Sequence, residues 1–80
     1  MDDEIEIKMK EFMKPLFGDM AQKTIDNQKE KLELEGKKLS NDDYVEIAES
    51  IRDLCRKMAG NAIADKIYNG LMEILEAESN

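Results

Sequence analysis

The stretch from Leu39 to Gly60 constrains the fold most, because it carries the signals for the start, the buried face and the end of one amphipathic helix. The hydroxyl of Ser40 can accept the backbone N–H of Asp43, and the Asp43 carboxylate can reach back to Ser40, which is the pattern of a capping box. Gly60 favours the left-handed conformation that often follows a helix. The sequence therefore predicts a helix over residues 41–59.

One face of this helix is apolar. At about 100° per residue, its apolar side chains fall within an arc of roughly 120°. They are Tyr44, Ile47, Ala48, Ile51, Leu54, Cys55 and Met58. We expect this face to be buried and Cys55, the one cysteine, to be an unreactive core thiol. Arg52 and Arg56 lie beside acidic residues of the same helix, so we expect them to pair within it.

A first helix is predicted over about residues 3–14. Its apolar stripe consists of Ile5, Met9, Phe12, Met13 and Leu16. Residues 5–9 also alternate between apolar and charged, which leaves a short strand as the alternative. Ile7 points away from the stripe, so we expect it on the surface. Pro15 disfavours helical geometry at Lys14 and predicts the end of the helix there.

The second helix is predicted to begin at Asp19, whose side chain can form a capping box with Gln22, and to end at Gly36. Its apolar positions are sparse, so it should pack lightly. The last helix is predicted from Asn61, as its N-cap, to about Ala77. Gly70 costs about 1 kcal/mol relative to Ala inside a helix, and a break there is the alternative to the continuous helix that we expect.

The apolar face of the last helix spans an arc of about 180°, which is wider than a small core needs. It consists of Ile63, Ala64, Ile67, Tyr68, Leu71, Met72, Ile74 and Leu75. We expect one edge, with Ile63, Ile67 and Ile74, to serve the core. The other edge, with Tyr68, Met72 and Leu75, is then free to contact a partner.

Shifting the chain by 42 positions aligns its two halves, with Gly18 on Gly60, Ile5 on Ile47 and Ile25 on Ile67. An internal pseudo-repeat and two independently amphipathic halves both explain this similarity. Either origin predicts an all-α fold, a small four-helix bundle of two αα-hairpins in which each hairpin covers the other. We expect residues 1–80 to form a single helical domain.

The charge of the chain bears on its partners. A net charge of −7 argues against binding to nucleic acid and to anionic membranes, because both need an excess of basic residues. No apolar run approaches the roughly 18 residues of a membrane-spanning helix, and the acidic start of the chain is unlike a signal peptide. These features predict a cytoplasmic protein that binds other proteins.

The chain contains no histidine, which removes the commonest catalytic base and the usual zinc sites. The acidic runs at residues 2–6 and 42–43 lack the alternating spacing and the glycine of a calcium loop, and the glycines occur singly rather than in a phosphate-binding loop. We therefore expect no enzyme activity, no metal and no cofactor.

These observations predict a small acidic interaction or regulatory module that acts by binding protein. Because a chain of 80 residues buries only about 60 to 65% of its unfolded surface, we expect a homodimer. The candidate interface residues are Ile7, Tyr68, Leu71, Met72 and Leu75. The alternative is a helical domain that binds a small ligand or an anion, at a helix N-terminus or in an apolar pocket between the hairpins.

Overall fold

The computed structural model describes residues 4–79, and all the regular secondary structure in that range is helical, which confirms the all-α prediction. The elements are α1 (Glu4–Phe17), the 3₁₀ helix η1 (Gly18–Met20), α2 (Ala21–Lys31), α3 (Asn41–Ala59) and α4 (Asn61–Ser79). No described helix combines the length and apolarity that crossing a membrane requires. Because no irregular residue separates α1, η1 and α2, residues 4–31 form one helical segment with a bend at η1.

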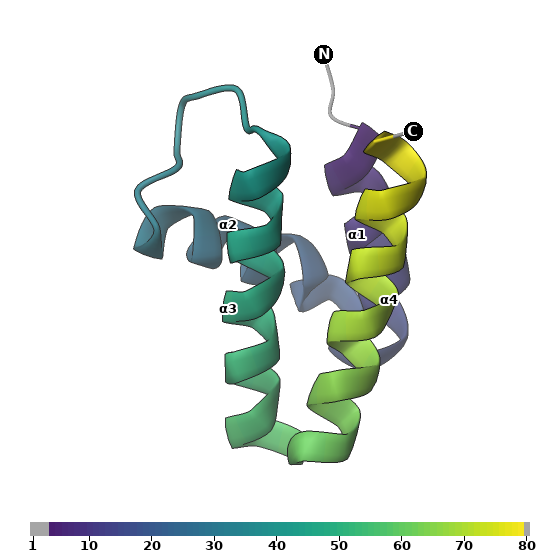
Figure 1. Ribbon diagram of the computed structural model, residues 1–80. Coiled ribbons are helices and arrows are strands. Elements are labelled where there is room, and N and C mark those ends of the chain that lie inside the picture. The colour runs from purple at the N-terminus through teal and green to yellow at the C-terminus, as the bar shows by residue number, and fades with distance from the viewer. Residues whose placement is uncertain (1–3, 80) are drawn as a thin grey trace.

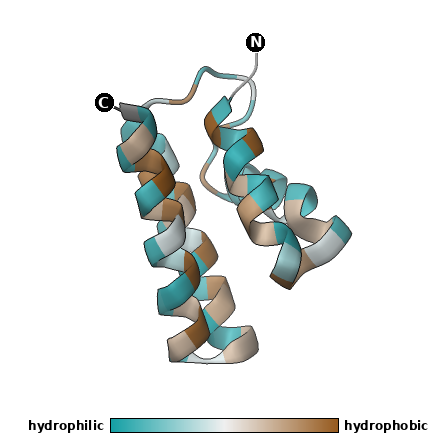
Figure 2. Ribbon diagram, turned by 90° about the vertical axis from the view of Figure 1, so that its right-hand side faces the viewer, coloured by the Kyte–Doolittle hydropathy of each residue, from teal (hydrophilic) through white to brown (hydrophobic). Residues whose placement is uncertain are grey.

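The helices form two layers. Helices α3 and α4 lie side by side as an antiparallel hairpin, with α1 against α4 and α2 against α3 (Figure 1). Helix α2 runs across α3 instead of returning alongside α1, so residues 4–31 form a bent helical segment and not the first of the two predicted αα-hairpins (Figure 1). Figure 2 shows the hairpin on the left and the α1–α2 layer on the right. An ion pair between Lys8 and Glu78 joins the start of α1 to the end of α4.

The core lies between the two layers. Its buried apolar residues are Met9, Met13, Ala21, Ile25, Leu34, Tyr44, Ile47, Ala48, Ile51, Cys55, Ala64, Ile67, Leu71 and Leu75. Burial raises the pKa of the Cys55 thiol, which confirms the prediction of a buried cysteine. A thiol with a raised pKa carries little thiolate at neutral pH and is correspondingly unreactive.

Helix α3 begins with the predicted capping box. The Ser40 Oγ accepts the Asp43 N–H at 3.1 Å, and the Ser40 N–H donates to the Asp43 carboxylate at 2.9 Å. This second bond is the main reason why the pKa of Asp43 is lowered, and Lys37, with its Nζ 3.5 Å away, lowers it further. Two of the free N–H groups at the start of α3 are thereby satisfied.

Gly60 joins α3 to α4 as a turn of one residue. Its N–H donates to the Arg56 carbonyl at 3.2 Å, and its own carbonyl accepts the Ala64 N–H at 3.1 Å. Gly60 therefore ends one helix and begins the next, while Asn61, predicted as the N-cap, is already helical. The φ of +92° and ψ of 173° at Gly60 lie in a region that is essentially restricted to glycine.

Replacing Gly60 with alanine should lower the free energy of unfolding by about 1 to 3 kcal/mol, because a Cβ is strained in this conformation whatever the space around it. Urea denaturation followed by circular dichroism measures this loss. A change below about 0.5 kcal/mol, as for an ordinary surface position, would contradict the role given to Gly60.

The first segment differs from prediction at its end. Helix α1 continues through Pro15 to Phe17, so the predicted end at Lys14 is wrong, as is the strand alternative. Proline removes one hydrogen bond from the last turn, but Met13 is buried and Phe17 packs against the core, which holds that turn in place. The predicted start at Asp3 lies outside the described residues.

The start of α2 was also predicted wrongly. Residue 19 belongs to η1, α2 begins at Ala21, and no side-chain hydrogen bond caps it. The Gln22 amide, predicted to complete a capping box with Asp19, instead donates to the Glu6 carboxylate at 2.9 Å. The Lys29 ammonium donates to the same carboxylate at 2.6 Å. Gln22 thus ties α2 to α1, a contact that only the bend at η1 makes available.

Helix α2 ends at Lys31, well before the predicted end at Gly36. Glu33 adopts a φ of +60°, and the N–H of Leu34 donates back to the Lys29 carbonyl at 2.8 Å, which closes the helix in a Schellman motif. The left-handed conformation costs a residue other than glycine about 1 kcal/mol. The motif turns Leu34 into the core, and its burial offsets that cost.

Helix α4 is continuous through Gly70, which confirms the preferred reading of this glycine, and it extends to Ser79, two residues beyond the predicted end. A Cβ on Gly70 would lie 2.0 Å from the Cζ atom of Phe12. The missing side chain therefore makes room for the Phe12 ring, and the glycine allows the close approach of α1 to α4.

A double-mutant cycle tests this contact. In a Phe12→Ala background, Gly70→Ala should stabilise the chain by about 1 kcal/mol through helix propensity. In the wild-type background the same change must displace the ring, so the gain should vanish or reverse, with a coupling free energy of at least about 0.5 kcal/mol from thermal or urea unfolding. Equal gains in both backgrounds would show that the ring does not depend on Gly70.

Candidate interaction surface

The structure separates the five residues predicted as an interface. Leu71 and Leu75 are 0% and 1% exposed and belong to the core, while Tyr68 and Met72 are half-buried on the same helix. Ile7 is 49% exposed on α1, as expected for a residue off the stripe. Contact of these five residues with a partner stays a prediction, but Leu71 and Leu75 are buried in the core and have almost no surface to offer one.

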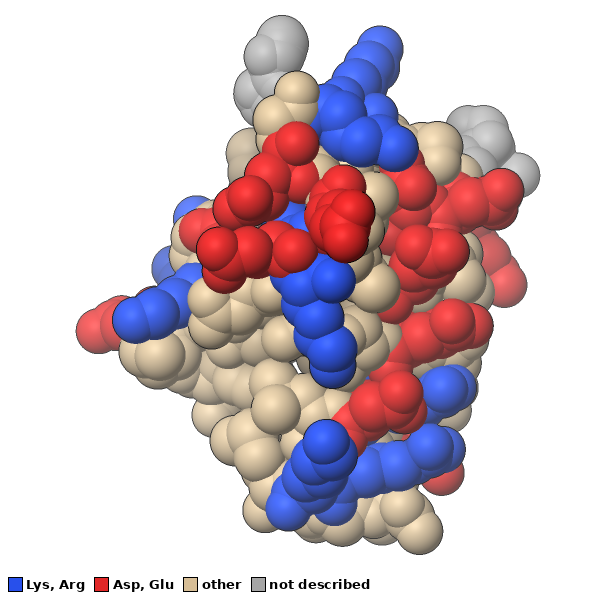
Figure 3. Space-filling view, turned by 90° about the vertical axis from the view of Figure 1, so that its left-hand side faces the viewer, with Lys and Arg blue, Asp and Glu red and all other residues tan. Residues whose placement is uncertain are grey.

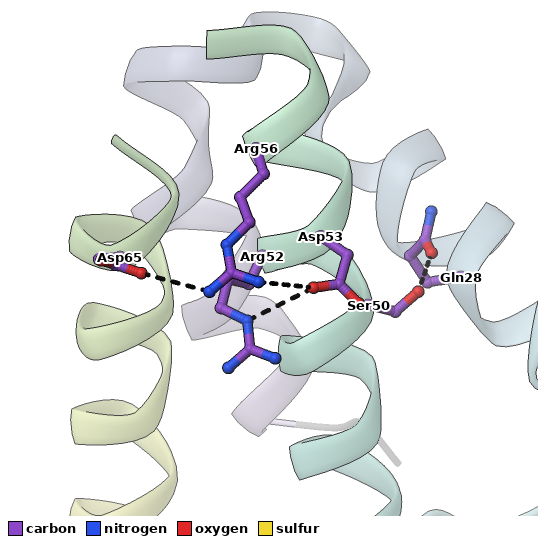
Figure 4. Close-up of polar contacts among 6 residues, drawn as sticks. All are labelled: Gln28, Ser50, Arg52, Asp53, Arg56 and Asp65. Carbon is purple, nitrogen blue, oxygen red and sulfur yellow. Dashed lines mark hydrogen bonds and ion pairs between the residues drawn. The ribbon is translucent and has the colours of Figure 1, made fainter. Parts of the chain in front are cut away.

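Tyr68 lies beside a network of charged residues on α3 and α4. The Arg52 guanidinium carbon lies 4.6 Å from the centre of the Tyr68 ring, within the range of a cation–π contact. The buried Arg52 Nε lies 3.5 Å from an Asp53 carboxylate oxygen. Arg56 lies between Asp53 at 3.5 Å and Asp65 at 3.8 Å (Figure 4). Both arginines are thus engaged within the chain, as expected for the pairing with Asp53.

A different set of apolar side chains reaches the surface. We call it the open end, and it consists of Leu16, Met20, Met58 and Ile63, whose exposed fractions are 44%, 52%, 66% and 40%. They come from four of the five helical elements: α1, η1, α3 and α4.

Each member of the open end continues a buried stripe by about one helical turn. Met58 follows Cys55 on α3, and Leu16 follows Met13 on α1. In the other direction, Ile63 precedes Ile67 on α4, and Met20 precedes Thr24. Residues three or four apart lie on the same helix face. The four side chains therefore surround the point where the core stops being covered.

The lengths of the helices explain why the core is uncovered at this end. Helices α3 and α4 have 19 residues each, whereas α1 has 14 and α2 has 11. In Figure 2 the hairpin extends below the bend that joins α1 to α2. The last turn of α3 and the first turn of α4 consequently have no helix of the other layer beside them.

Basic residues lie close in sequence to the members of the open end. Lys14, Lys23, Lys57 and Lys66 each lie within three positions of one of its members. Lys14 lies 3.7 Å from Glu11. In the part of the chain that the structure describes, no ion pair engages the other three lysines. Figure 3 shows a broad area without charged side chains on the lower left of one face, with basic side chains at its lower border.

Sequence reasoning missed the open end because it placed Met58 and Ile63 in the core. Periodicity identifies the apolar face of a helix, but it does not tell how far another helix covers that face. One signal was present in the sequence. Leu16 and Met20 lie two residues on either side of Gly18, and Met58 lies two residues before Gly60. Apolar residues beside a glycine turn lie where two helices end and cover is thinnest.

Two grooves on the surface are possible sites for a small ligand. The groove between α1 and α4 has a volume of about 290 Å³ and is lined by Lys8, Phe12, Gly70, Glu73, Ile74, Ala77 and Glu78. This lies at the lower limit of the volumes found for ligand pockets, about 300 to 1,000 Å³. The groove between α2 and α3 is larger, about 380 Å³, and is lined by Lys31, Leu32, Glu46, Glu49, Ser50 and Asp53, of which three are acidic and disfavour an anion. Within residues 4–79 no three acidic or cysteine side chains are grouped so as to hold a metal ion.

Comparisons of the chain with known protein families, with curated proteins and with solved structures gave no match.

The open end and the core should respond differently to truncation. Met58→Ala should change the free energy of unfolding by less than about 0.5 kcal/mol, because the side chain is 66% exposed. Met13→Ala, at a fully buried position, should cost about 2 to 5 kcal/mol. Urea denaturation of both variants measures the difference. A large loss for Met58→Ala would mean that Met58 belongs to the core.

Proposed function

We propose that this chain is a small protein-interaction module that binds its partner through the open end. The observation that carries the proposal is the exposure of Leu16, Met20, Met58 and Ile63 at one end of the molecule. Apolar side chains that are scattered singly need no explanation, but apolar side chains grouped where the core is uncovered mark contact surfaces in soluble proteins. Such a surface loses its contact with water when a partner covers it.

The open end has more support as a contact surface than the edge of α4. On that edge Leu75 is 1% exposed and Tyr68 is half-buried under Arg52. A charge introduced at Leu75 would disrupt the core and could not report on an interface. Homodimerisation, expected from the short chain, remains one form of the proposal, in which the open end is covered by a second copy.

Binding of a small ligand or an anion has less support. The groove between α1 and α4 is shallow and small, and Lys8, which lines it, is already paired with Glu78. The side-chain hydrogen bond from Lys8 to Glu78 raises the pKa of Lys8, so the lysine stays charged and engaged with Glu78.

The internal pseudo-repeat is also retained as a proposal. Some equivalent positions in the two halves have matching exposure: Met9 and Ile51 are both fully buried, and Ile25 and Ile67 are both in the core. Leu16, matched with Met58, is likewise exposed. Ile5, which aligns with the fully buried Ile47, is only partly buried. Each half would be a helix, a glycine corner and a helix, with the first half bent at η1 and the second folded into a hairpin. Any two amphipathic helices share part of this pattern.

A capture experiment tests the proposed function. The tagged full chain is compared with a Met20→Gln/Met58→Gln variant, which makes the open end polar without changing its charge. Proteins cross-linked to each in cell extract are quantified by mass spectrometry. Those that bind the open end should be depleted at least about tenfold by the variant, which corresponds to about 1.4 kcal/mol.

The matched control is Ile7→Gln, since Ile7 is similarly exposed but lies on α1 away from the open end. The proposal thus places the contact surface away from Ile7, although the sequence put this residue among the interface candidates. It should leave the captured set unchanged, and circular dichroism should show all three proteins folded. Loss of the same proteins with Ile7→Gln, or no loss with the double variant, would contradict binding through the open end.

A further inference from the structure

We infer that the partner segment at the open end is an acidic amphipathic helix, which lays its apolar face on Leu16, Met20, Met58 and Ile63 and its acidic residues against the surrounding lysines. This inference rests on the proposed function and names the chemistry of the partner. Apolar contact supplies the affinity, and the lysines select the sign of the partner's charge.

The charge around the open end is opposite to that of the rest of the chain. Residues 14–23 and 53–67 carry five basic and three acidic side chains, an excess of two positive charges. Since the whole chain has a net charge of −7, the remaining residues carry −9. An acidic partner is therefore repelled by most of the molecule and attracted at this end, which orients its approach.

Among the four lysines near the open end, Lys14 is paired with an acidic residue, Glu11 at 3.7 Å. Asp53 lies 3.5 Å from both Arg52 and Arg56, and Asp65 lies 3.8 Å from Arg56, so two arginines balance these two carboxylates inside the chain. Asp19 is the remaining acid in these two segments. Lys23, Lys57 and Lys66 have no ion pair with another described residue, so their charge is available to a partner.

The charge arrangement disfavours a second copy of the chain. In a two-fold symmetric dimer the same patch faces itself, so the lysines around one open end would lie opposite those of the other. Like charges held close together weaken association. An anionic membrane would meet the same lysines, but its extended surface would also approach the acidic remainder of a molecule that measures 32 × 26 × 21 Å. A single helix contacts the open end alone.

The secondary structure favours a helix as the docked segment. Residues 4–79 contain no strand, so the described part of the chain offers no sheet edge to which an extended peptide could add. The open end is formed by helix ends, and their apolar side chains can interlock with those of a helix at positions i, i+3, i+4 and i+7.

Methyl NMR with designed peptides tests the inference on the full chain. The methionine methyl groups are labelled with ¹³C, so Met20 and Met58 report on the open end while the buried Met9 and Met13 serve as internal references. Three 18-residue helical peptides share one leucine stripe and carry Glu, Gln or Lys at all other positions. Each is titrated at low salt and again at about 0.25 M salt, where screening is strong.

We expect the Glu peptide to shift the Met20 and Met58 signals and to bind at least about tenfold tighter than the Lys peptide, with a loss of affinity at high salt. Lys57→Gln/Lys66→Gln should weaken this binding severalfold. Lys10→Gln/Lys38→Gln makes the same change in net charge outside the two segments around the open end and should have little effect.

Four results would overturn the inference. The first is equal or tighter binding of the Lys peptide, and the second is no shift with any peptide. The third is binding of vesicles with anionic phospholipid that Met20→Gln/Met58→Gln abolishes. The fourth is a dimer in sedimentation that the same variant dissociates. The proposed function fails separately, when the capture experiment shows no dependence on Met20 and Met58, so a wrong partner charge and a wrong binding surface give different results.

Discussion

The one-residue turn at Gly60 is the constraint on which the rest of the structure depends. Its N–H closes α3 and its carbonyl opens α4, so no loop separates the two longest helices. The two helices lie side by side and antiparallel, which brings their apolar stripes to one face. At about 1.5 Å per residue each helix is about 28 Å long. The rest of the chain has to cover the apolar face of this hairpin.

The second layer, formed by α1 and α2, covers only part of the apolar face of the hairpin. Polar contacts fix the shape of this layer, since Glu6 on α1 accepts hydrogen bonds from both Gln22 and Lys29 on α2. Two contacts fix its position: Phe12 rests on Gly70, and Ser50 donates a hydrogen bond to Gln28. With these contacts made, α1 and α2 are too short to reach the turn of the hairpin. The exposed apolar side chains at that end follow from the difference in helix length.

The same geometry separates stability from binding in this chain. The fully buried stripes hold the two layers together, and their continuation past the last buried turn adds little to the core. Residues there can change without unfolding the protein, which gives a contact surface freedom to match a partner. Arg52 and Arg56 are paired with Asp53 and Asp65, whereas Lys23, Lys57 and Lys66 have no ion pair with another described residue.

The sequence by itself determined the helical class, the capping box at Ser40, the buried face of α3 and the need for glycine at residue 60, because these depend on residues within a few positions of one another. The tertiary structure decided which side chains of each apolar face are buried by the other helices. Met58 and Ile63 have the periodicity of core residues, yet they are exposed, while Leu75, expected at a partner, is buried in the core. The bend at η1, the early end of α2 and the fit of Phe12 on Gly70 also depend on contacts between distant segments. A periodic pattern shows which face of a helix is apolar, but only the packing of the other helices determines how much of that face is buried.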